Sequence, residues 1–137
     1  MEKQEYVVGF AFDETRTSVA LIRKNRPVWQ YGLLNGIGGK IEPGEHPDDA
    51  MRREFREEAG VDCAWEKFLE ASGEQYKLYC YRAVVPGLGD KITSLTDEQV
   101  SMIYVPAIRD SGCIPNLFWM VPMAADFDVE QAVVFQK

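Results

Sequence analysis

Three carboxylates within five residues give the chain its clearest chemical signal. Glu54, Glu57 and Glu58 occupy positions i, i+3 and i+4 of one short segment. Because each residue of an α-helix advances by about 100°, the three side chains would leave a helix within an arc of roughly 100°. Like charges this close destabilise an isolated helix, so their presence indicates a positive partner. Hard cations such as Mg²⁺ prefer oxygen ligands, and the pattern therefore predicts a divalent-metal site.

A glycine-rich turn precedes these carboxylates, and the combined segment resembles a known motif. It is similar to the Nudix box, which reads Gly, five residues, Glu, seven residues, Arg-Glu, an aliphatic or aromatic residue, any residue, Glu-Glu, any residue, Gly and an aliphatic residue. The fixed positions are filled in register by Gly39, Glu45, Arg53, Glu54, Phe55, Glu57, Glu58, Gly60 and Val61. A match with this spacing, over 23 of the 137 residues, is far more specific than a lone glycine motif.

The resemblance to MutT-type Nudix hydrolases implies an activity and a metal. It implies a pyrophosphohydrolase that cleaves a nucleoside diphosphate joined to another group, with water attacking phosphorus. It implies Mg²⁺ as the cofactor, with Mn²⁺ as a substitute. On matching positions, Glu57 and Glu58 are expected to be the principal metal ligands, and Glu54 a further ligand or the base that activates water.

Residues around the three carboxylates also gain expected roles from the resemblance. The backbone carbonyl of Gly38 is expected to complete the metal coordination. Arg53 is expected to pair with the box glutamates and orient them, with Glu45 as its structural partner. Gly39 and Lys40 are placed at the substrate phosphates, although Lys40 is equally well explained as a solvated charge. The competing interpretation of the helix is an exposed, salt-bridged surface whose acids are balanced by Arg52, Arg53 and Arg56.

One further metal ligand is expected from outside the box. Glu98 is the candidate, because it stands just before a predicted strand. Asp97 and Glu74 compete with it for this position, and an ordinary solvated carboxylate is the other interpretation. His46 is the only histidine, and it is expected to be exposed or to cap the helix rather than to act in catalysis.

Substrate recognition is expected at Asn35 and in a late aromatic segment. The run from Asn35 to Ile41 is similar to MutT-type enzymes that hydrolyse oxidised purine nucleoside triphosphates, in which an asparagine here hydrogen-bonds the base. A side-chain amide offers both a donor and an acceptor, as a purine edge requires. In the late segment, Asn116 would read the base and Phe118 or Trp119 would stack on it. The alternative is that these aromatic residues belong to the core.

The chain departs from that branch in two places, which keeps other functions open. Leu34 stands where the branch often has tryptophan, and an asparagine and apolar residues replace the aspartates of the late segment. The leading hypothesis is hydrolysis of a (deoxy)nucleoside triphosphate, such as an oxidised purine nucleotide, to monophosphate and pyrophosphate. The alternatives are an ADP-ribose or sugar-nucleotide pyrophosphatase and a non-catalytic module that senses a nucleotide.

The carboxylates require a helix, and the sequence predicts its ends. Pro47 suits the first helical position, and Asp48 and Asp49 in the first turn favour the helix dipole. Gly60 is a fitting residue to follow the last turn. The helix is therefore expected at Pro47–Ala59. Its core-facing stripe would consist of Met51, Phe55 and Ala59.

The remaining elements alternate between strands and one further helix. Strands are expected at Glu5–Asp13, Ser18–Lys24, Tyr31–Ile41 (running into a tight loop), Cys63–Gly73, Gln75–Val85, Gln99–Val105 and Phe127–Gln136. The first two would form a hairpin. Loops are expected at Pro86–Asp90 and Arg109–Asn116, and a short helix at Leu117–Ala125. This order indicates an α/β fold, and the resemblance specifies an α/β/α sandwich with a mixed sheet.

Composition bounds the organisation and the partners. A chain of 137 residues with 46% hydrophobic residues suits a single domain, here 1–137. A net charge of −7 argues against binding to a nucleic-acid polymer but not to a nucleotide, since metal ions reverse the local potential. The sequence has no membrane-length apolar run and no secretory start, and three cysteines without metal spacing indicate free thiols. We expect a cytoplasmic monomer or homodimer.

Overall fold

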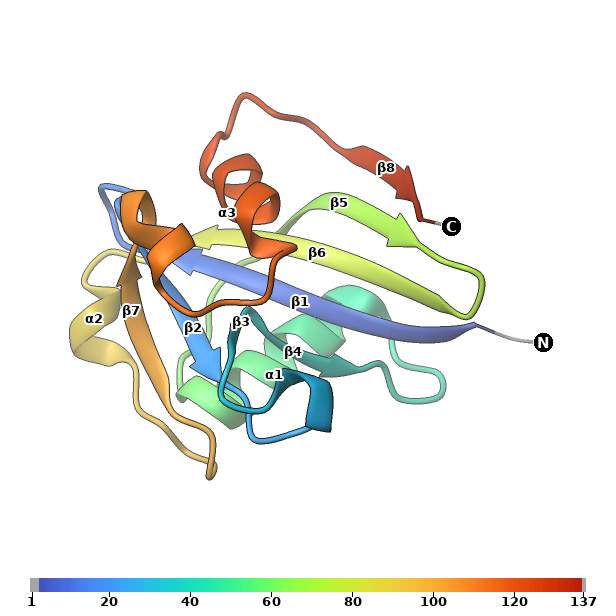
Figure 1. The fold of residues 1–137 in the computed structure, drawn as a ribbon, viewed down its shortest axis with the longest axis horizontal. Helices are drawn as coiled ribbons and strands as arrows, with labels where there is room; N and C mark the ends of the chain where they lie inside the picture. Colours follow the sequence, from blue (N-terminus) through green and yellow to red (C-terminus); the bar gives the residue numbers. More distant parts are fainter. Residues whose placement is uncertain (1–2, 137) are drawn as a thin grey trace.

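A mixed sheet of eight strands organises the chain, which the computed structural model describes from residue 3 to residue 136 (Figure 1). The strands are β1 (Gln4–Phe12), β2 (Ser18–Arg23), β3 (Leu34–Asn35), β4 (Ile37–Lys40), β5 (Glu66–Ser72), β6 (Tyr76–Val84), β7 (Val100–Tyr104) and β8 (Ala132–Phe135). The helices are α1 (Pro47–Ala59), α2 (Leu88–Lys91) and α3 (Leu117–Ala125), with 3₁₀ turns η1 (Val28–Gln30) and η2 (Val105–Asp110).

Strand β1 is the centre of this sheet. The main path runs β3-β2-β1-β6-β5-β8, while β4 pairs with β1 and β7 pairs with β2. β1 is antiparallel to β2 and β4 but parallel to β6, so the sheet is mixed. The expected hairpin of the first two strands is confirmed by the antiparallel pairs Ala11↔Ala20 and Phe12↔Val19.

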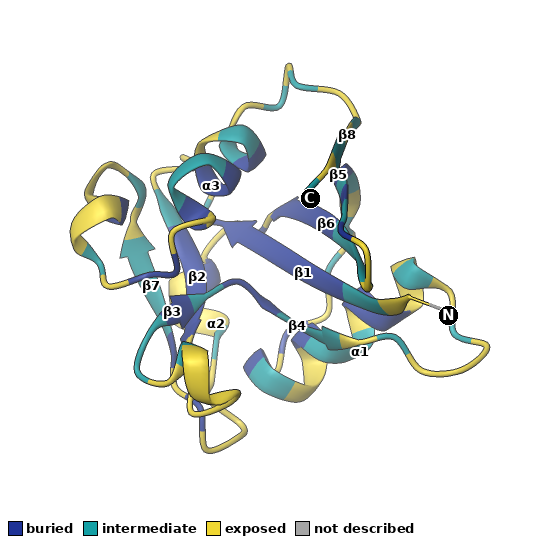
Figure 2. Cartoon of the chain, turned by 45° about the vertical axis from the view of Figure 1, so that its right-hand side comes forward, coloured by how far each residue is buried: buried dark blue, intermediate teal, exposed yellow. Residues whose placement is uncertain are grey.

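Two apolar layers cover the two faces of the sheet. Because successive side chains of a strand point to opposite faces, β1 contributes to both layers. Phe10 and Phe12 pack with α3 and β5, whereas Val7 and Ala11 pack with α1. Figure 2 shows β1 and β6 largely buried, with the partly exposed helix α1 on one side and the mostly buried or half-buried α3 on the other. The expected α/β/α arrangement with a mixed sheet is confirmed.

Helix α1 begins and ends where the sequence predicts, for identifiable reasons. The Nδ1 atom of His46 accepts a hydrogen bond from the backbone N–H of Asp48 at 3.1 Å, which caps one of the free N–H groups of the first turn. Gly60 adopts a left-handed conformation (φ 74°) and donates its N–H to the Arg56 carbonyl. The bounds of α3 also match the prediction.

The structure differs from the prediction in the segments Tyr31–Ile41 and Pro86–Asp90. Tyr31–Ile41 is not one strand, because β3 pairs with β2 and β4 pairs with β1. The chain changes partner at Gly36, where a Cβ atom would lie 2.6 Å from the Val8 side chain. The predicted loop at Pro86–Asp90 contains the start of α2, because Leu88 is fully buried and packs the segment onto the core.

The C-terminal strand is shorter than predicted. Only β8 pairs, alongside β5, although the prediction began at Phe127. The residues before β8 are held in a turn by Arg82, whose guanidinium donates to the carbonyls of Asp126 and Val129 at 2.9 and 2.7 Å. The predicted loop at 109–116 likewise loses its first two residues to η2.

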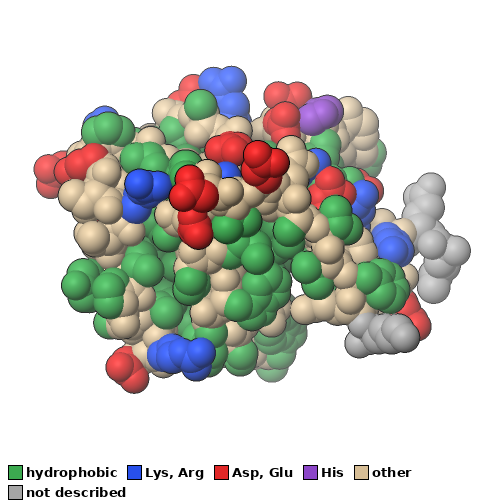
Figure 3. Space-filling model, turned by 90° about the horizontal axis from the view of Figure 1, so that it is seen from above, with side chains coloured by type: hydrophobic (Ala, Val, Ile, Leu, Met, Phe, Trp, Pro, Cys, Tyr) green, Lys and Arg blue, Asp and Glu red, His purple; other side chains and the backbone are tan. Residues whose placement is uncertain are grey.

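Within residues 3–136, none of the helices has the length and apolarity needed to cross a bilayer. On the face seen in Figure 3, acidic side chains stand among hydrophobic ones and basic side chains occur singly.

Candidate functional site

Helix α1 is fixed on the sheet by its apolar stripe. Met51, Phe55 and Ala59 are fully buried, as the spacing predicts. This packing turns the neighbouring face of the helix, which carries Glu54, toward β4. A Cβ atom on Gly39 would lie 2.6 Å from Glu54 Oε1, closer than real atoms approach, so only glycine admits this carboxylate.

Arg53 joins the carboxylates on one side of α1. Its Nε and Nη2 atoms donate to the two Glu45 oxygens at 2.8 and 3.0 Å, which makes a bidentate pair. Its Nη1 atom lies 2.9 Å from Glu54 Oε1 and 3.3 Å from Glu57 Oε2, and Nη2 also donates to the Lys40 carbonyl. The hydrogen bonds from Arg53 lower the pKa of Glu45.

Two of the carboxylates are deprived of water. Burial raises the pKa of Glu54, against the opposing effect of Arg53. Burial, reinforced by the charge of Glu54, raises the pKa of Glu58 to about 8. The Oε2 atom of Glu58 is buried and has no hydrogen-bond partner. A buried, unpartnered carboxylate beside a second one is costly, and a divalent cation would remove that cost. These residues therefore fit a hard metal ion.

The three carboxylates lie close together but do not converge on one point. Within residues 3–136, no three His, Cys, Asp or Glu side chains surround a common point as metal ligands would. The Glu57 side chain is 57% exposed and turned toward Arg53. Gly38 is fixed in β4 opposite Val8, where its backbone lies against β1.

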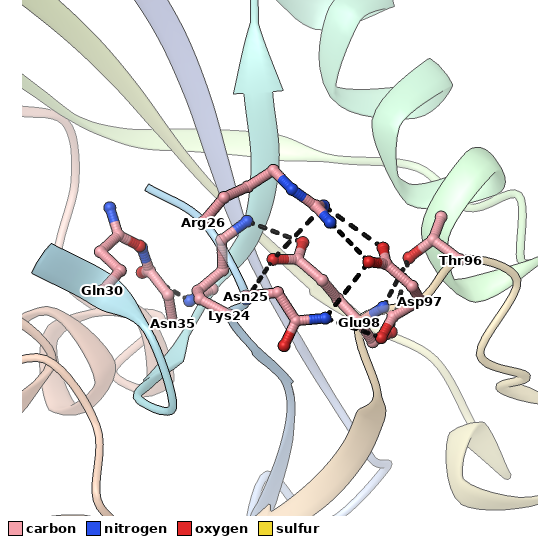
Figure 4. Close-up of polar contacts among 9 residues, drawn as sticks. Lys24, Asn25, Arg26, Gln30, Asn35, Thr96, Asp97 and Glu98 are labelled. Atoms are coloured by element: carbon pink, nitrogen blue, oxygen red, sulfur yellow. Dashed lines mark hydrogen bonds and ion pairs between the residues drawn. The ribbon is translucent and has the colours of Figure 1, made fainter. Parts of the chain in front are cut away.

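Glu98 lies in the loop before β7 and is only 4% exposed. Both of its carboxylate oxygens already accept hydrogen bonds (Figure 4). Oε1 accepts from Lys24 Nζ at 2.9 Å and Oε2 from the Asn25 backbone N–H at 2.6 Å. Burial opposes ionisation, but these hydrogen bonds lower the pKa of Glu98 overall. Its competitor Asp97 is exposed and pairs with Arg26, whereas Glu74 lines a separate open groove beside the box loop.

The predicted base-reading asparagine has a partner in the loop before it. Asn35 Nδ2 donates to Gln30 Oε1 at 2.9 Å, and Asn35 Oδ1 accepts from the Gly36 N–H at 2.7 Å. One N–H and one lone pair of the amide stay free for a ligand. Leu34 pairs with Cys113, which brings the segment before α3 next to Asn35.

The late aromatic segment is compatible with both base contact and core packing. Asn116 is exposed at the start of α3 and makes no side-chain capping bond. Trp119 and Phe118 are half-buried and pack against the apolar layer, and the Arg109 guanidinium lies 4.8 Å from the Phe118 ring centre. Only the exposed edge of each ring could contact a ligand. The buried part of Phe118 and Trp119 belongs to the core.

Spacing along the chain does not single out Lys24 or Gln30. Lys24 meets a carboxylate 74 residues away, which no local pattern encodes. A signal for Gln30 does exist: it stands between Trp29 and Tyr31, and Pro27 precedes them. Aromatic residues in a segment with a strand-breaking proline indicate an exposed apolar loop.

Comparison with known proteins identifies the family of this fold. The model of the NUDIX domain matches residues 3–109. The chain belongs to the NUDIX domain family. It is a Nudix hydrolase, and hence a pyrophosphohydrolase of nucleoside diphosphate-linked compounds; such enzymes generally need divalent metal ions. Among curated protein sequences, none matches the chain.

Solved structures share the Nudix fold at low sequence identity. One is from a study of MutT from Aliivibrio salmonicida and Vibrio cholerae, with a TM-score of 0.75, 18% identity and coverage of 90% of this chain and 98% of that one. A mutator MutT protein from Bacillus halodurans has a TM-score of 0.75 and 18% identity over 95% and 86% of the two chains. A NUDIX-family hydrolase from Clostridium perfringens has 0.74 and 17% over 92% and 98%.

Proposed function

We propose that this Nudix hydrolase cleaves a (deoxy)nucleoside triphosphate to the monophosphate and pyrophosphate, using Mg²⁺ or, in its place, Mn²⁺. An oxidised purine nucleotide is the leading substrate. The observation that carries the proposal is the buried oxygen of Glu58, which has no partner and lies on the same helix face as Glu54. Such an arrangement is costly unless it holds a cation, and phosphoryl transfer uses such cations.

The metal would be held by residues of α1 and β4. Glu57, Glu58 and Glu54 supply carboxylate oxygens, and Gly38 supplies its backbone carbonyl. A bound divalent ion neutralises charge on the phosphate oxygens and makes a coordinated water more acidic. We leave Glu98 out of this set, because both of its oxygens already accept hydrogen bonds from Lys24 and Asn25.

The chain's own groups would orient the reaction. Glu54 has a raised pKa, so its carboxylate suits the acceptance of a proton from the attacking water. Arg53 holds Glu54 from one side and is itself held by the bidentate pair with Glu45. Gly39 keeps the backbone close to Glu54, and Lys40 next to it would meet a phosphate oxygen.

Base recognition would fall to Asn35, with Asn116, Phe118 and Trp119 as further contacts. The free N–H and lone pair of Asn35 support this role. We propose a small nucleotide as the partner, rather than a nucleic-acid polymer or a membrane. The enzyme would be a monomer or a homodimer. The three free cysteines support a reducing compartment such as the cytoplasm.

An assay of Mg²⁺-dependent nucleoside monophosphate release tests the proposal. Nucleoside triphosphates, oxidised purine triphosphates, ADP-ribose and dinucleoside polyphosphates are compared at equal concentration. We expect a nucleoside triphosphate to have the highest kcat/KM, and Glu57→Gln to lower turnover by orders of magnitude while the protein stays folded. Glu130→Gln, at an exposed carboxylate outside the site, is the matched control. Preference for ADP-ribose, or full turnover by Glu57→Gln at saturating Mg²⁺, would refute it.

A further inference from the structure

The segment between β2 and β3 exposes large apolar side chains close together. Val28 is 93% exposed, Trp29 66% and Tyr31 71%. Single exposed hydrophobic residues are ordinary, but three within four residues form a patch. None of them contributes to either apolar layer of the fold. The packing of the protein therefore gives no reason for their presence.

This segment is held in place rather than loose. Its ends are closed by two backbone hydrogen bonds, Lys24 N–H to the Leu33 carbonyl at 2.9 Å and Gly32 N–H to the Lys24 carbonyl at 2.8 Å. The Arg23 guanidinium also donates to the Gly32 carbonyl at 2.7 Å. Between these ends, the 3₁₀ turn η1 ends at Gln30. The aromatic side chains are thus presented from a fixed backbone.

The loop before β7 connects the aromatic segment to helix α1. Glu98 holds Lys24 and the Asn25 backbone, and the neighbouring Asp97 holds Arg26 (Figure 4). The same loop donates the Leu95 N–H to a carbonyl of α1, that of Glu58, at 3.1 Å. Its side chains and backbone therefore join the aromatic segment to the end of α1.

The aromatic segment also touches the predicted base-reading residue. Gln30, between the two aromatic residues in sequence, accepts the hydrogen bond of Asn35. From Asn35 the chain runs through β4 to Gly39, which lies against Glu54. Even fully extended, these four residues span at most about 14 Å. A nucleotide with its phosphates at Glu54 would therefore place its base near Gln30 and the aromatic side chains.

We propose that residues 25–33 recognise the planar base of the substrate, with Trp29 stacking on it, and that Glu98 is the positioning residue that anchors them. This proposal rests on the proposed nucleotide substrate. Stacking on an aromatic side chain suits any base and adds affinity without using the metal. The ion pair between Glu98 and Lys24 keeps the backbone of the recognition segment in register with α1.

Calorimetric binding of a non-hydrolysable nucleoside triphosphate, with an imido bridge at the scissile position, tests the role of Trp29. Inorganic triphosphate, which has no base, is the second probe. We expect Trp29→Ala to weaken nucleotide binding by about tenfold to a hundredfold, and to leave triphosphate binding within about twofold. Trp29→Phe should retain most of the affinity. Tyr104→Ala is the matched control, because Tyr104 is 59% exposed but lies at the opposite end of β2.

Lys24→Met and Glu98→Gln test the anchor. We expect each variant to weaken nucleotide binding several-fold, the double variant to be no worse than either, and the affinity for Mn²⁺ alone to stay unchanged in all three. Circular dichroism confirms that each is folded. Loss of Mn²⁺ affinity in Glu98→Gln but not in Lys24→Met would make Glu98 a metal ligand and overturn its anchoring role.

The outcomes separate the two proposals. Wild-type protein that binds no nucleoside triphosphate would refute the proposed function itself. Wild-type protein that binds the nucleotide, with Trp29→Ala unchanged, would refute base recognition alone. If Trp29→Ala instead alters only the oligomeric state, measured by light scattering, the patch is a contact between copies of the chain and the inference is overturned.

Discussion

Replacing Glu58 with glutamine should stabilise the protein without metal while it removes metal binding. Glutamine has the shape of the protonated carboxyl group but carries no charge. In the native protein, burial and the charge of Glu54 raise the pKa of Glu58 to about 8, and one of its oxygens has no partner. At pH 8 a large share of the native molecules therefore carries an ionised group in an environment that disfavours it. The substitution removes that penalty.

The sign and the size of the effect follow from the raised pKa. A group whose pKa is higher in the folded than in the unfolded state stabilises fully below its unfolded pKa, and this stability is lost as pH rises through the folded pKa. For Glu58 the window runs from 4.5 to about 8. At 1.36 kcal/mol per pH unit the full loss is at most about 5 kcal/mol, and residual solvent contact lowers it to a value between about 2 kcal/mol and this limit. At roughly 4 °C per kcal/mol, Glu58→Gln should raise Tm by at least about 8 °C above pH 8.

Thermal unfolding followed by circular dichroism measures this effect. Both proteins are compared in chelator at pH 5 and at pH 8.5, and again at pH 8.5 with excess Mg²⁺. The Tm difference should be small at pH 5, large at pH 8.5 in chelator, and reduced by Mg²⁺, which stabilises only the wild type by about 2.7 kcal/mol at 100 times Kd. Glu57→Gln, at an exposed position, is the control with little change in chelator. A less stable Glu58→Gln at pH 8.5 without metal would refute the reasoning.

Two further substitutions test other parts of the site. Gly39→Ala places a methyl group 2.6 Å from Glu54 Oε1, so it should displace that carboxylate and weaken Mn²⁺ binding at least tenfold by calorimetry, while Gly89→Ala in α2, where the added methyl meets only Met102 at an ordinary 3.7 Å, leaves binding unchanged. Asn35→Ala removes an amide that has a free donor and acceptor, so it should lower kcat/KM for purine triphosphates by about tenfold and leave inorganic triphosphate binding unaffected; equal losses for purine and pyrimidine substrates would contradict base reading.

The carboxylate helix could be predicted in full from local sequence. Pro47 and Gly60 mark its ends, and the stripe at Met51, Phe55 and Ala59 fixes which side faces the core. These are short-range effects, because capping and helical periodicity depend on residues within one or two turns. The direction of the glutamates follows from the same periodicity. Strands with a clear run of apolar, β-prone residues, such as β1 and β6, were likewise predictable to within one or two residues.

Sheet partners and long-range ion pairs could not be predicted in this way. Ile37 and Asn35 are two residues apart, yet β4 pairs with β1 and β3 with β2, because the chain turns at a glycine that the Val8 side chain packs against. A strand's own pattern states which side is apolar but not which neighbour it pairs with.

The sequence by itself determined that carboxylates gather on one face of a capped helix beside a glycine turn. Only the tertiary structure decided that Glu98 holds Lys24 and Asn25, and that Gln30 joins Asn35. The reason is that a side chain's helical direction is set by its near neighbours, whereas the partner of a buried charge is set by which loops the folded sheet brings together.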